Sequence, residues 1–157
     1  LQSRTHFFST KADYLSGNLK INQHEAEKIV ELVTAFQQIY HDNQTELTSK
    51  SIGIITPYRA QIAQIRKVLN TTNEDYSWLT IDTVERYQGG ARDIILISLC
   101  TNSASQLESL VSLSDEGVDR KLNVALTRAR KHLVVVGNAE LLRGNTVYEQ
   151  LMDTFSN

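Results

Sequence analysis

Three short runs of apolar, mostly β-branched residues most constrain how this chain can fold. They are Ile52–Ile55, Ile94–Leu99 and Leu133–Val136. Short runs that stay apolar, rather than alternating with polar residues, are typical of strands buried on both faces of a parallel sheet. Two weaker runs, at residues 5–8 and 79–84, predict further strands. The sequence therefore predicts a mostly parallel sheet.

Amphipathic helices are expected between these strands. In the first, Asn22 is the expected N-cap, and Glu25 three residues later completes a capping-box pattern. We expect that helix to end near residues 41–43. The second is expected to begin at Thr56, with its hydroxyl as N-cap and Pro57 in the first helical position.

Two later helices are expected at residues 118–131 and 147–155, with a polar loop over residues 102–117 before the first of them. Helices that alternate with buried strands cover both faces of a parallel sheet. The sequence therefore predicts one domain over residues 1–157, with the α/β architecture of a three-layer sandwich.

Composition excludes several classes of protein. The formal net charge of -2 argues against a freestanding binder driven by bulk positive charge, although a local basic patch remains compatible with it. Cys100 is the only cysteine, so we expect a buried thiol and neither an internal disulfide nor a zinc site. No apolar run approaches the ~18 residues of a membrane span, and no signal peptide opens the chain. We expect a cytoplasmic protein with no membrane partner and no metal site.

The histidines are scattered along the chain, and each is expected at a surface or structural position rather than a catalytic one: His6, His24, His41 and His132.

Polar residues gather in three segments that we expect at the carboxyl ends of strands, where open parallel sheets bind ligands. Residues 56–61 predict an anion site at a helix start, with Tyr58 and Arg59 available to nucleic acid. The alternative is an ordinary capped helix. Residues 83–90 end in glycines that let the backbone approach a phosphate, but such loops are common.

Residues 120–130, the third segment, are the most informative. Helical spacing places Lys121, Val124 and Arg128 on one face of the expected helix. Such a cationic face suits an anion, and a merely solvated face is the alternative. The residues expected to point into the core are Leu122, Ala125, Leu126 and Ala129.

In this order the three segments resemble the later motifs of superfamily 1 helicases, in the branch with the nonsense-mediated-decay helicase and the Okazaki-fragment helicase-nuclease. Residues 53–61 read Gly-Ile-Ile-Thr-Pro-Tyr-Arg-Ala-Gln and resemble the Thr-Pro-Tyr element of motif IV. Residues 83–89 resemble motif V, and residues 120–130 resemble motif VI. The resemblance spans roughly residues 50–142 and implies a RecA-like fold of the P-loop NTPase type, here the second, C-terminal motor domain.

The resemblance implies a nucleotide side. Arg128 is the expected arginine finger for the ATP γ-phosphate, and Gln88, Gly89 and Gly90 are expected at the edge of the nucleotide. Ala91 departs from the family, which commonly has a Glu at this position. This departure implies either weakened nucleotide affinity or coupling, or a diverged member of the family.

The resemblance also implies a nucleic-acid side. Single-stranded DNA or RNA is expected to lie along Thr56, Tyr58, Arg59 and Thr83, which contact its backbone. Arg130 is expected to form a structural salt bridge.

The sequence has no Gly-x-x-x-x-Gly-Lys-[Ser/Thr] phosphate loop and no Asp-Glu pair placed to bind magnesium. We therefore expect a fragment of a larger protein, in which an N-terminal RecA-like domain of the same polypeptide holds most of the ATP and Mg²⁺. The chain alone is expected not to hydrolyse ATP. A diverged, non-catalytic nucleic-acid-binding or regulatory module is the alternative. An unrelated small α/β enzyme fits poorly, because no Gly-x-Gly-x-x-Gly turn, nucleophile elbow or Cys/His cluster is present.

Overall fold

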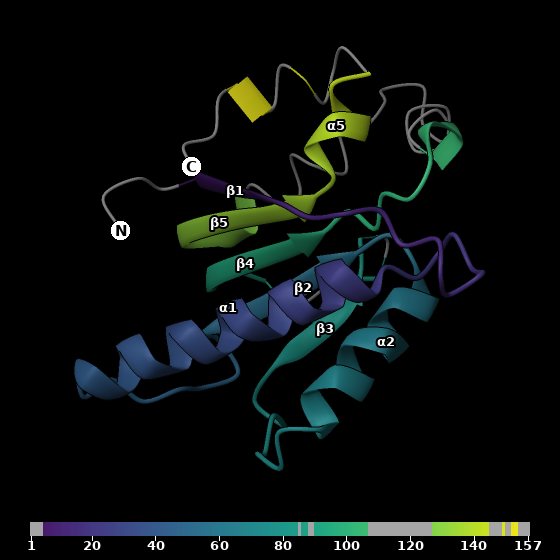
Figure 1. The fold of residues 1–157 in the computed structure, drawn as a ribbon. Coiled ribbons are helices and arrows are strands. Elements are labelled where there is room, and N and C mark those ends of the chain that lie inside the picture. Colours follow the sequence, from purple (N-terminus) through teal and green to yellow (C-terminus); the bar gives the residue numbers. More distant parts are fainter. Residues whose placement is uncertain are drawn as a thin grey trace.

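A five-stranded parallel sheet forms the centre of the molecule, in the order β1-β5-β4-β2-β3 (Figure 1). This computed structural model describes residues 5–84, 86–87, 90–106, 127–144, 149 and 152–153. The parallel sheet predicted from the sequence is confirmed. Its strands are β1 (Thr5–Ser9), β2 (Ile52–Thr56), β3 (Thr80–Thr83), β4 (Arg92–Ser98) and β5 (Ala129–Gly137).

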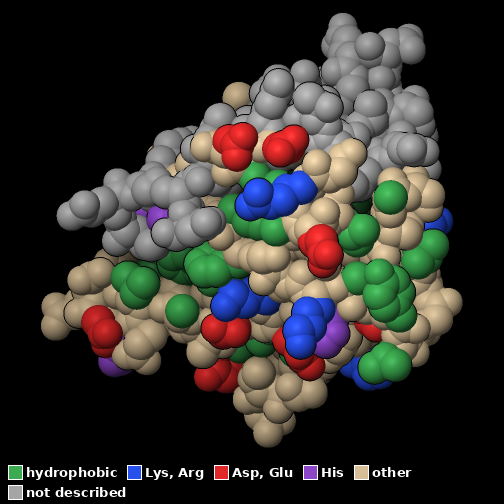
Figure 2. Space-filling model, turned by 45° about the horizontal axis from the view of Figure 1, so that its top comes forward, with side chains coloured by type: hydrophobic (Ala, Val, Ile, Leu, Met, Phe, Trp, Pro, Cys, Tyr) green, Lys and Arg blue, Asp and Glu red, His purple; other side chains and the backbone are tan. Residues whose placement is uncertain are grey.

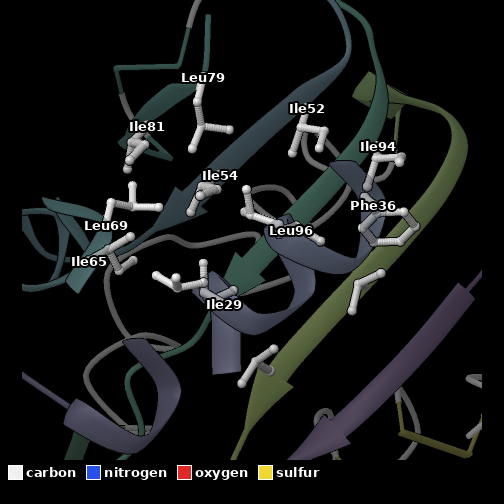
Figure 3. Packing of buried hydrophobic residues seen from close by; sticks show 14 of the residues in the cluster. Ile29, Phe36, Ile52, Ile54, Ile65, Leu69, Leu79, Ile81, Ile94 and Leu96 are labelled. Atoms are coloured by element: carbon white, nitrogen blue, oxygen red, sulfur yellow. The ribbon is translucent and has the colours of Figure 1, made fainter. Parts of the chain in front are cut away.

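Helices lie on both faces of this sheet, as a three-layer sandwich requires. Helices α1 (Gln23–Asp42) and α2 (Arg59–Asn70) pack on one face, and α5 (Ala139–Leu142) packs on the other (Figure 1). Successive residues of β4 alternate between the two cores, because side chains along a strand point to opposite faces. Ile94 and Leu96 belong to the apolar cluster under α1 and α2, which Figure 3 shows. Ile95, Ile97 and Leu99 belong to the apolar cluster on the opposite face of the sheet.

The start of α1 only half follows the predicted capping box. The cap itself is confirmed, because the Asn22 Oδ1 accepts the Glu25 N–H at 2.8 Å. The second bond of a capping box, from the Asn22 N–H to the Glu25 side chain, is absent. The Asn22 N–H donates instead to the Gln61 Oε1 at 2.8 Å, and the Glu25 carboxylate accepts a bond at the end of β4. Side chains from distant segments take the place of the expected local partner.

The start of α2 differs from the prediction. Thr56 is the last residue of β2 and is fully buried, so its hydroxyl does not cap the helix. The helix begins at Arg59, with Tyr58 as an extended N-cap residue that makes no side-chain capping bond. Proline disfavours helical geometry in the residue before it, so Pro57 keeps Thr56 in the strand.

The expected helix over residues 118–131 is wrong at its C-terminal end, since β5 already begins at Ala129. Ala129 pairs with Arg92 in the sheet, and this tertiary pairing overrides the helical spacing of the sequence. Only Thr127 and Arg128 of that helix lie within the described residues. The expected core positions Leu122, Ala125 and Leu126, most of the expected closing helix and the loop beyond residue 106 lie outside them.

Cys100 and two of the histidines pack in or against the described part of the core. Cys100 is a buried free thiol, as predicted. His6 is buried with its ring 5.7 Å from that of His132, which stacks on Phe36, so the rings of both histidines pack against other aromatic rings. In the described part of the chain, no helix is long and apolar enough to cross a membrane. No three acidic, histidine or cysteine side chains gather there as metal ligands.

Candidate nucleic-acid interface and nucleotide site

The carboxyl ends of β2 and β3 bring together the four residues predicted to face nucleic acid. Thr56 and Thr83 are register partners on these adjacent strands, and their side chains are 0% and 6% exposed. Tyr58 is half-buried, and Arg59, the first residue of α2, is exposed. The accessible groups at this edge are therefore the ring of Tyr58 and the guanidinium of Arg59, with the two threonines enclosed beneath them.

Tyr58 is held in place from two sides. Its hydroxyl accepts a bond of 3.3 Å from the Gln106 Nε2, and the Lys20 ammonium lies 5.8 Å from the centre of its ring. Burial raises the pKa of the Tyr58 phenol, so the group stays neutral at physiological pH. An oriented aromatic ring with a cation beside it suits stacking on a base.

A buried polar network lies beneath this edge. The Gln61 Nε2 donates to the Ser98 Oγ at 3.3 Å, and that hydroxyl donates to the Glu25 Oε1 at 2.9 Å. The backbone N–H groups of Cys100 and Thr101 donate to the two Glu25 oxygens at 2.8 and 2.9 Å. One carboxylate from the start of α1 therefore fixes the chain where it leaves β4.

Cys100 makes this arrangement possible through its backbone. Its φ of 54° lies in the left-handed region, which non-glycine residues rarely adopt. This conformation turns two successive N–H groups toward one anion, as in the backbone nests that bind phosphates. Burial raises the pKa of Glu25 to about 7, although the Cys100, Thr101 and Ser98 bonds oppose that rise.

Asn102 holds the loop between β1 and α1 at the same edge of the sheet. Its Oδ1 accepts the Asp13 N–H and the Asn22 Nδ2, both at 2.8 Å. Its Nδ2 donates to the carbonyls of Leu19 and Ile21 at 3.0 and 2.6 Å. The amide of a single residue therefore positions the loop between β1 and α1.

Sequence reasoning missed most of this network. Gln61 carried a usable signal, because it precedes the buried Ile65 and Leu69 at a spacing of four residues and so occupies a core-facing position of α2. A polar residue at such a position requires a buried hydrogen-bond partner. Ser98 and Asn102 gave no comparable signal.

The predicted nucleotide-side residues lie at the opposite end of the sheet. Arg128 immediately precedes β5, whose first residue pairs with Arg92 at the start of β4. Gly90, with a φ of 69°, lies just before β4, and Gln88 and Gly89 lie outside the described residues. The expectation that residues 120–130 lie at the carboxyl end of a strand is wrong for Arg128, which lies at the amino end of β5. The length of β4 separates Arg128 from the nucleic-acid edge by about 20 Å along the strands.

Arg128 lies beside Tyr87. Its Nε is buried and has no hydrogen-bond partner among the described residues. Burial raises the pKa of the Tyr87 phenol, while the nearby guanidinium groups of Arg92 and Arg128 act in the other direction. Arg92 lies 5.8 Å from the centre of the same ring. Two arginines therefore converge on a neutral phenol at this end of the sheet.

Arg130 has a different environment, and its predicted structural salt bridge is confirmed. Its Nε lies 3.7 Å from the Asp93 Oδ1, and the Lys131 Nζ lies 3.9 Å from the Asp93 Oδ2. The Tyr40 hydroxyl donates to the same carboxylate at 3.0 Å. Arg130 therefore has a structural partner on β4.

Charges of both signs are mixed over the face in Figure 2, where Lys and Arg side chains lie beside Asp and Glu side chains. This agrees with a net charge of -2, and no single sign of charge dominates this face.

Comparison with known proteins gives a consistent result. Residues 3–140 match a family model described as an AAA domain. The chain is 37% identical over 134 residues to helicase sen1 of Schizosaccharomyces pombe, an alignment with 84% of this chain and 8% of that protein. It is 34% identical over 146 residues to regulator of nonsense transcripts 1 of Dictyostelium discoideum, with 90% of this chain and 10% of that protein. The chain therefore spans about a tenth of the length of these relatives.

The fold is also found in a solved structure. The crystal structure of the C-terminal domain of a "possible DNA helicase" from Lactobacillus plantarum superposes with a TM-score of 0.55 at 13% sequence identity. The alignment covers 93% of this chain and 83% of that one. At this identity the likeness shows a shared fold.

Proposed function

We propose a function from the premise that this chain belongs to the AAA domain family, in the superfamily 1 helicases that include helicase sen1 and regulator of nonsense transcripts 1. Its fold is that of a helicase C-terminal, RecA-like domain. The proposed function is that of the second motor domain of an ATP-dependent helicase, which translocates on single-stranded DNA or RNA. The observation that carries the proposal is the family match over residues 3–140.

In this proposal Arg128 supplies an arginine finger to ATP bound between this domain and an N-terminal RecA-like domain of the same polypeptide. A guanidinium suits the role because its charge is permanent and its donors match phosphoryl oxygens. The buried Nε without a partner among the described residues supports it, as does the neutral Tyr87 beside it. Gly90, with Gln88 and Gly89, would approach the nucleotide through its backbone.

Mg²⁺ and most contacts to ATP are assigned to the N-terminal domain, since the sequence of this chain has no phosphate loop and no Asp-Glu pair placed to bind magnesium. Bound there, Mg²⁺ would neutralise charge on the phosphate oxygens. The contribution of this chain is to orient the Arg128 guanidinium and to close against the nucleotide.

The nucleic-acid part of the proposal rests on Tyr58 and Arg59. The ring stacks on a base and the guanidinium contacts a phosphate, while Thr56 and Thr83 shape the edge beneath them. Opening and closing of the two domains on ATP would then shift this grip along the strand.

The test uses the longer protein that contains this chain, with ATP hydrolysis measured in the presence of oligo(dT) and oligo(rU). Replacing Arg128 with Ala should lower stimulated turnover by about 10³-fold or more and leave oligonucleotide affinity unchanged. Arg130→Ala is the matched control, because its partner is the structural Asp93, and it should retain most turnover. Full turnover in Arg128→Ala would reject the arginine-finger role.

Ala91 favours a second candidate, a diverged binding or regulatory module, because a methyl group cannot make the polar contact of the usual Glu. Its carbonyl accepts bonds from the Arg92 Nη1 at 3.1 Å and from the Arg130 Nη2 at 3.4 Å, which is a structural use of the position. A parent protein that binds oligonucleotides without any stimulated ATP hydrolysis would support this second candidate.

A further inference from the structure

The loop between β1 and α1, residues 10–22, exposes apolar side chains at the carboxyl edge of the sheet. Tyr14, Leu15 and Leu19 are 74%, 96% and 48% exposed, and they are three of the four exposed large hydrophobic residues in the described part of the chain. Figure 1 places this loop beside the start of α2. Figure 2 shows hydrophobic side chains at the surface on the same side of the molecule.

The backbone of this loop is fixed although its side chains are exposed. The Asp13 Oδ1 accepts the Leu15 and Ser16 N–H groups at 3.0 and 3.2 Å, and its Oδ2 accepts the Gln23 N–H at 2.9 Å. Burial raises the pKa of Asp13, but these bonds outweigh burial and hold it below the usual value. Asn102, in the segment that follows β4, holds the other end of the loop through the carbonyls of Leu19 and Ile21. The loop therefore presents its side chains on a preformed backbone.

The exposed charges of this loop are positive. Its only carboxylate, Asp13, is buried and turned inward, whereas Lys11 and Lys20 are exposed. The Lys20 ammonium lies over the ring of Tyr58. The basic and aromatic surface of the loop is therefore continuous with the edge formed by Tyr58 and Arg59.

We propose that the β1–α1 loop is a further binding site for single-stranded nucleic acid. Tyr14 stacks on a base, and Lys11 and Lys20 contact phosphates on either side of it. Stacking aromatics combined with cations form the usual chemistry for holding a flexible strand without sequence preference. The inference rests on the proposed function and extends the strand's path beyond Tyr58 and Arg59.

The test measures the affinity of this chain for fluorescently labelled oligo(dT) and oligo(rU) by anisotropy at several salt concentrations. Tyr14→Ala should weaken binding by about fivefold or more with an unchanged salt slope, because stacking involves no charge. Tyr14→Phe should restore the affinity. Lys20→Gln should reduce the salt slope by about 0.7, the value for one phosphate contact on a single strand.

Lys50→Gln is the charge-matched control, since Lys50 is exposed and lies before the amino end of β2. It should change neither affinity nor salt slope. Arg59→Gln reports on the proposed function itself. If Arg59→Gln weakens binding while Tyr14→Ala and Lys20→Gln do not, the loop site is rejected and the proposed function stands.

A second outcome would also reject the loop site. The exposed Leu15 and Tyr14 are compatible with a contact to the other motor domain. If Tyr14→Ala lowers stimulated ATP hydrolysis in the longer protein without any change in oligonucleotide affinity, the loop contacts protein. If the wild-type chain binds neither oligonucleotide, both the loop site and the proposed nucleic-acid edge are rejected.

Discussion

Glu25 shows how one residue in this molecule serves an unexpected purpose. Its place after Asn22 suggests local capping, yet its carboxylate is fully buried and accepts bonds from Ser98, Cys100 and Thr101. Burial removes water from this carboxyl group, so it would cost folding free energy if these hydrogen bonds were missing. The loss of this one group should affect the whole carboxyl edge.

We expect Glu25→Gln to destabilise the chain by about 1–3 kcal/mol at pH 4, because the amide brings two N–H donors to a place where the Cys100 and Thr101 N–H groups already donate, whereas a protonated carboxyl brings one. The effect should depend on pH. Glu25 has a folded pKa of about 7, above its value of 4.5 in the unfolded chain, so it stabilises the fold most below pH 4.5. That contribution is lost as the pH rises through 7.

The measurement is urea unfolding of the wild-type chain and Glu25→Gln between pH 4 and pH 8. The difference in stability between the two should shrink across that range. Glu31→Gln, an exposed carboxylate on the same helix, is the control and should show a small, constant difference. A pH-independent difference for Glu25→Gln would contradict the raised pKa.

Gly53 illustrates a close approach rather than a special backbone conformation. A Cβ at this position would meet the Tyr87 hydroxyl. Gly53→Ala should therefore cost about 1–3 kcal/mol through overpacking. Combining it with Tyr87→Phe, which removes a buried hydroxyl that lacks a partner among the described residues, should recover most of the loss. Thermal unfolding of the single and double variants tests this, and an unrecovered double variant would show that the clash lies elsewhere.

At the scale of elements, α1 is fastened to β4 at both ends. Its first turn contributes Glu25 to the carboxyl end of β4, and near its last turn the Tyr40 hydroxyl donates to Asp93 at the amino end. The helix is about 30 Å long and runs along β4 in the opposite direction (Figure 1). Burial, followed by the bond to Asp93, raises the pKa of Tyr40 to about 12. The two polar ends fix how α1 lies on the sheet, while its apolar face supplies the contact area.

Tyr40→Phe should cost about 1–2 kcal/mol, since it removes a hydrogen bond to a carboxylate and leaves the packing of the ring intact. Ile39→Ala is the neighbouring control. Ile39 is 44% exposed, and its replacement should change stability by about 0.5 kcal/mol or less. Urea unfolding compares the two. Equal losses would indicate that general packing, rather than the Asp93 bond, holds this end of α1.

At the scale of the whole molecule, the candidate sites occupy opposite ends of one sheet. Tyr58 and Arg59 follow the carboxyl end of β2, and Arg128 precedes the amino end of β5. Parallel strands with a close-packed core join the two ends. In the proposed function, nucleotide is bound at the Arg128 end and the nucleic-acid strand at the Tyr58 end.

The chain alone should hydrolyse no ATP, with or without oligonucleotide. The sequence contains no phosphate loop to cradle the β- and γ-phosphates, so an arginine finger has no bound phosphate to act on. Phosphate release from the purified chain, measured beside the longer parent protein, tests this. Turnover by the chain alone that is lost in Arg128→Ala would place a complete site within these 157 residues.

The sequence by itself determined the parallel sheet and the main helices, and its three motif segments indicated the family. These features are local: buried strands require unbroken apolar runs, helices require apolar residues at helical spacing, and Asn22 caps through the N–H of Glu25 three residues away. The motif residues are likewise read from contiguous segments.

Only the tertiary structure decided which distant groups meet. Glu25 bonds to Cys100 across 75 residues, and no local pattern encodes such a partner. Pairing with Arg92 made Ala129 the first residue of β5 where the sequence favours a helix. Arg128 lies at the amino end of the sheet because it directly precedes that strand. Buried polar groups take the partners that the topology brings to them, because leaving them unpaired costs more than local propensity can offset.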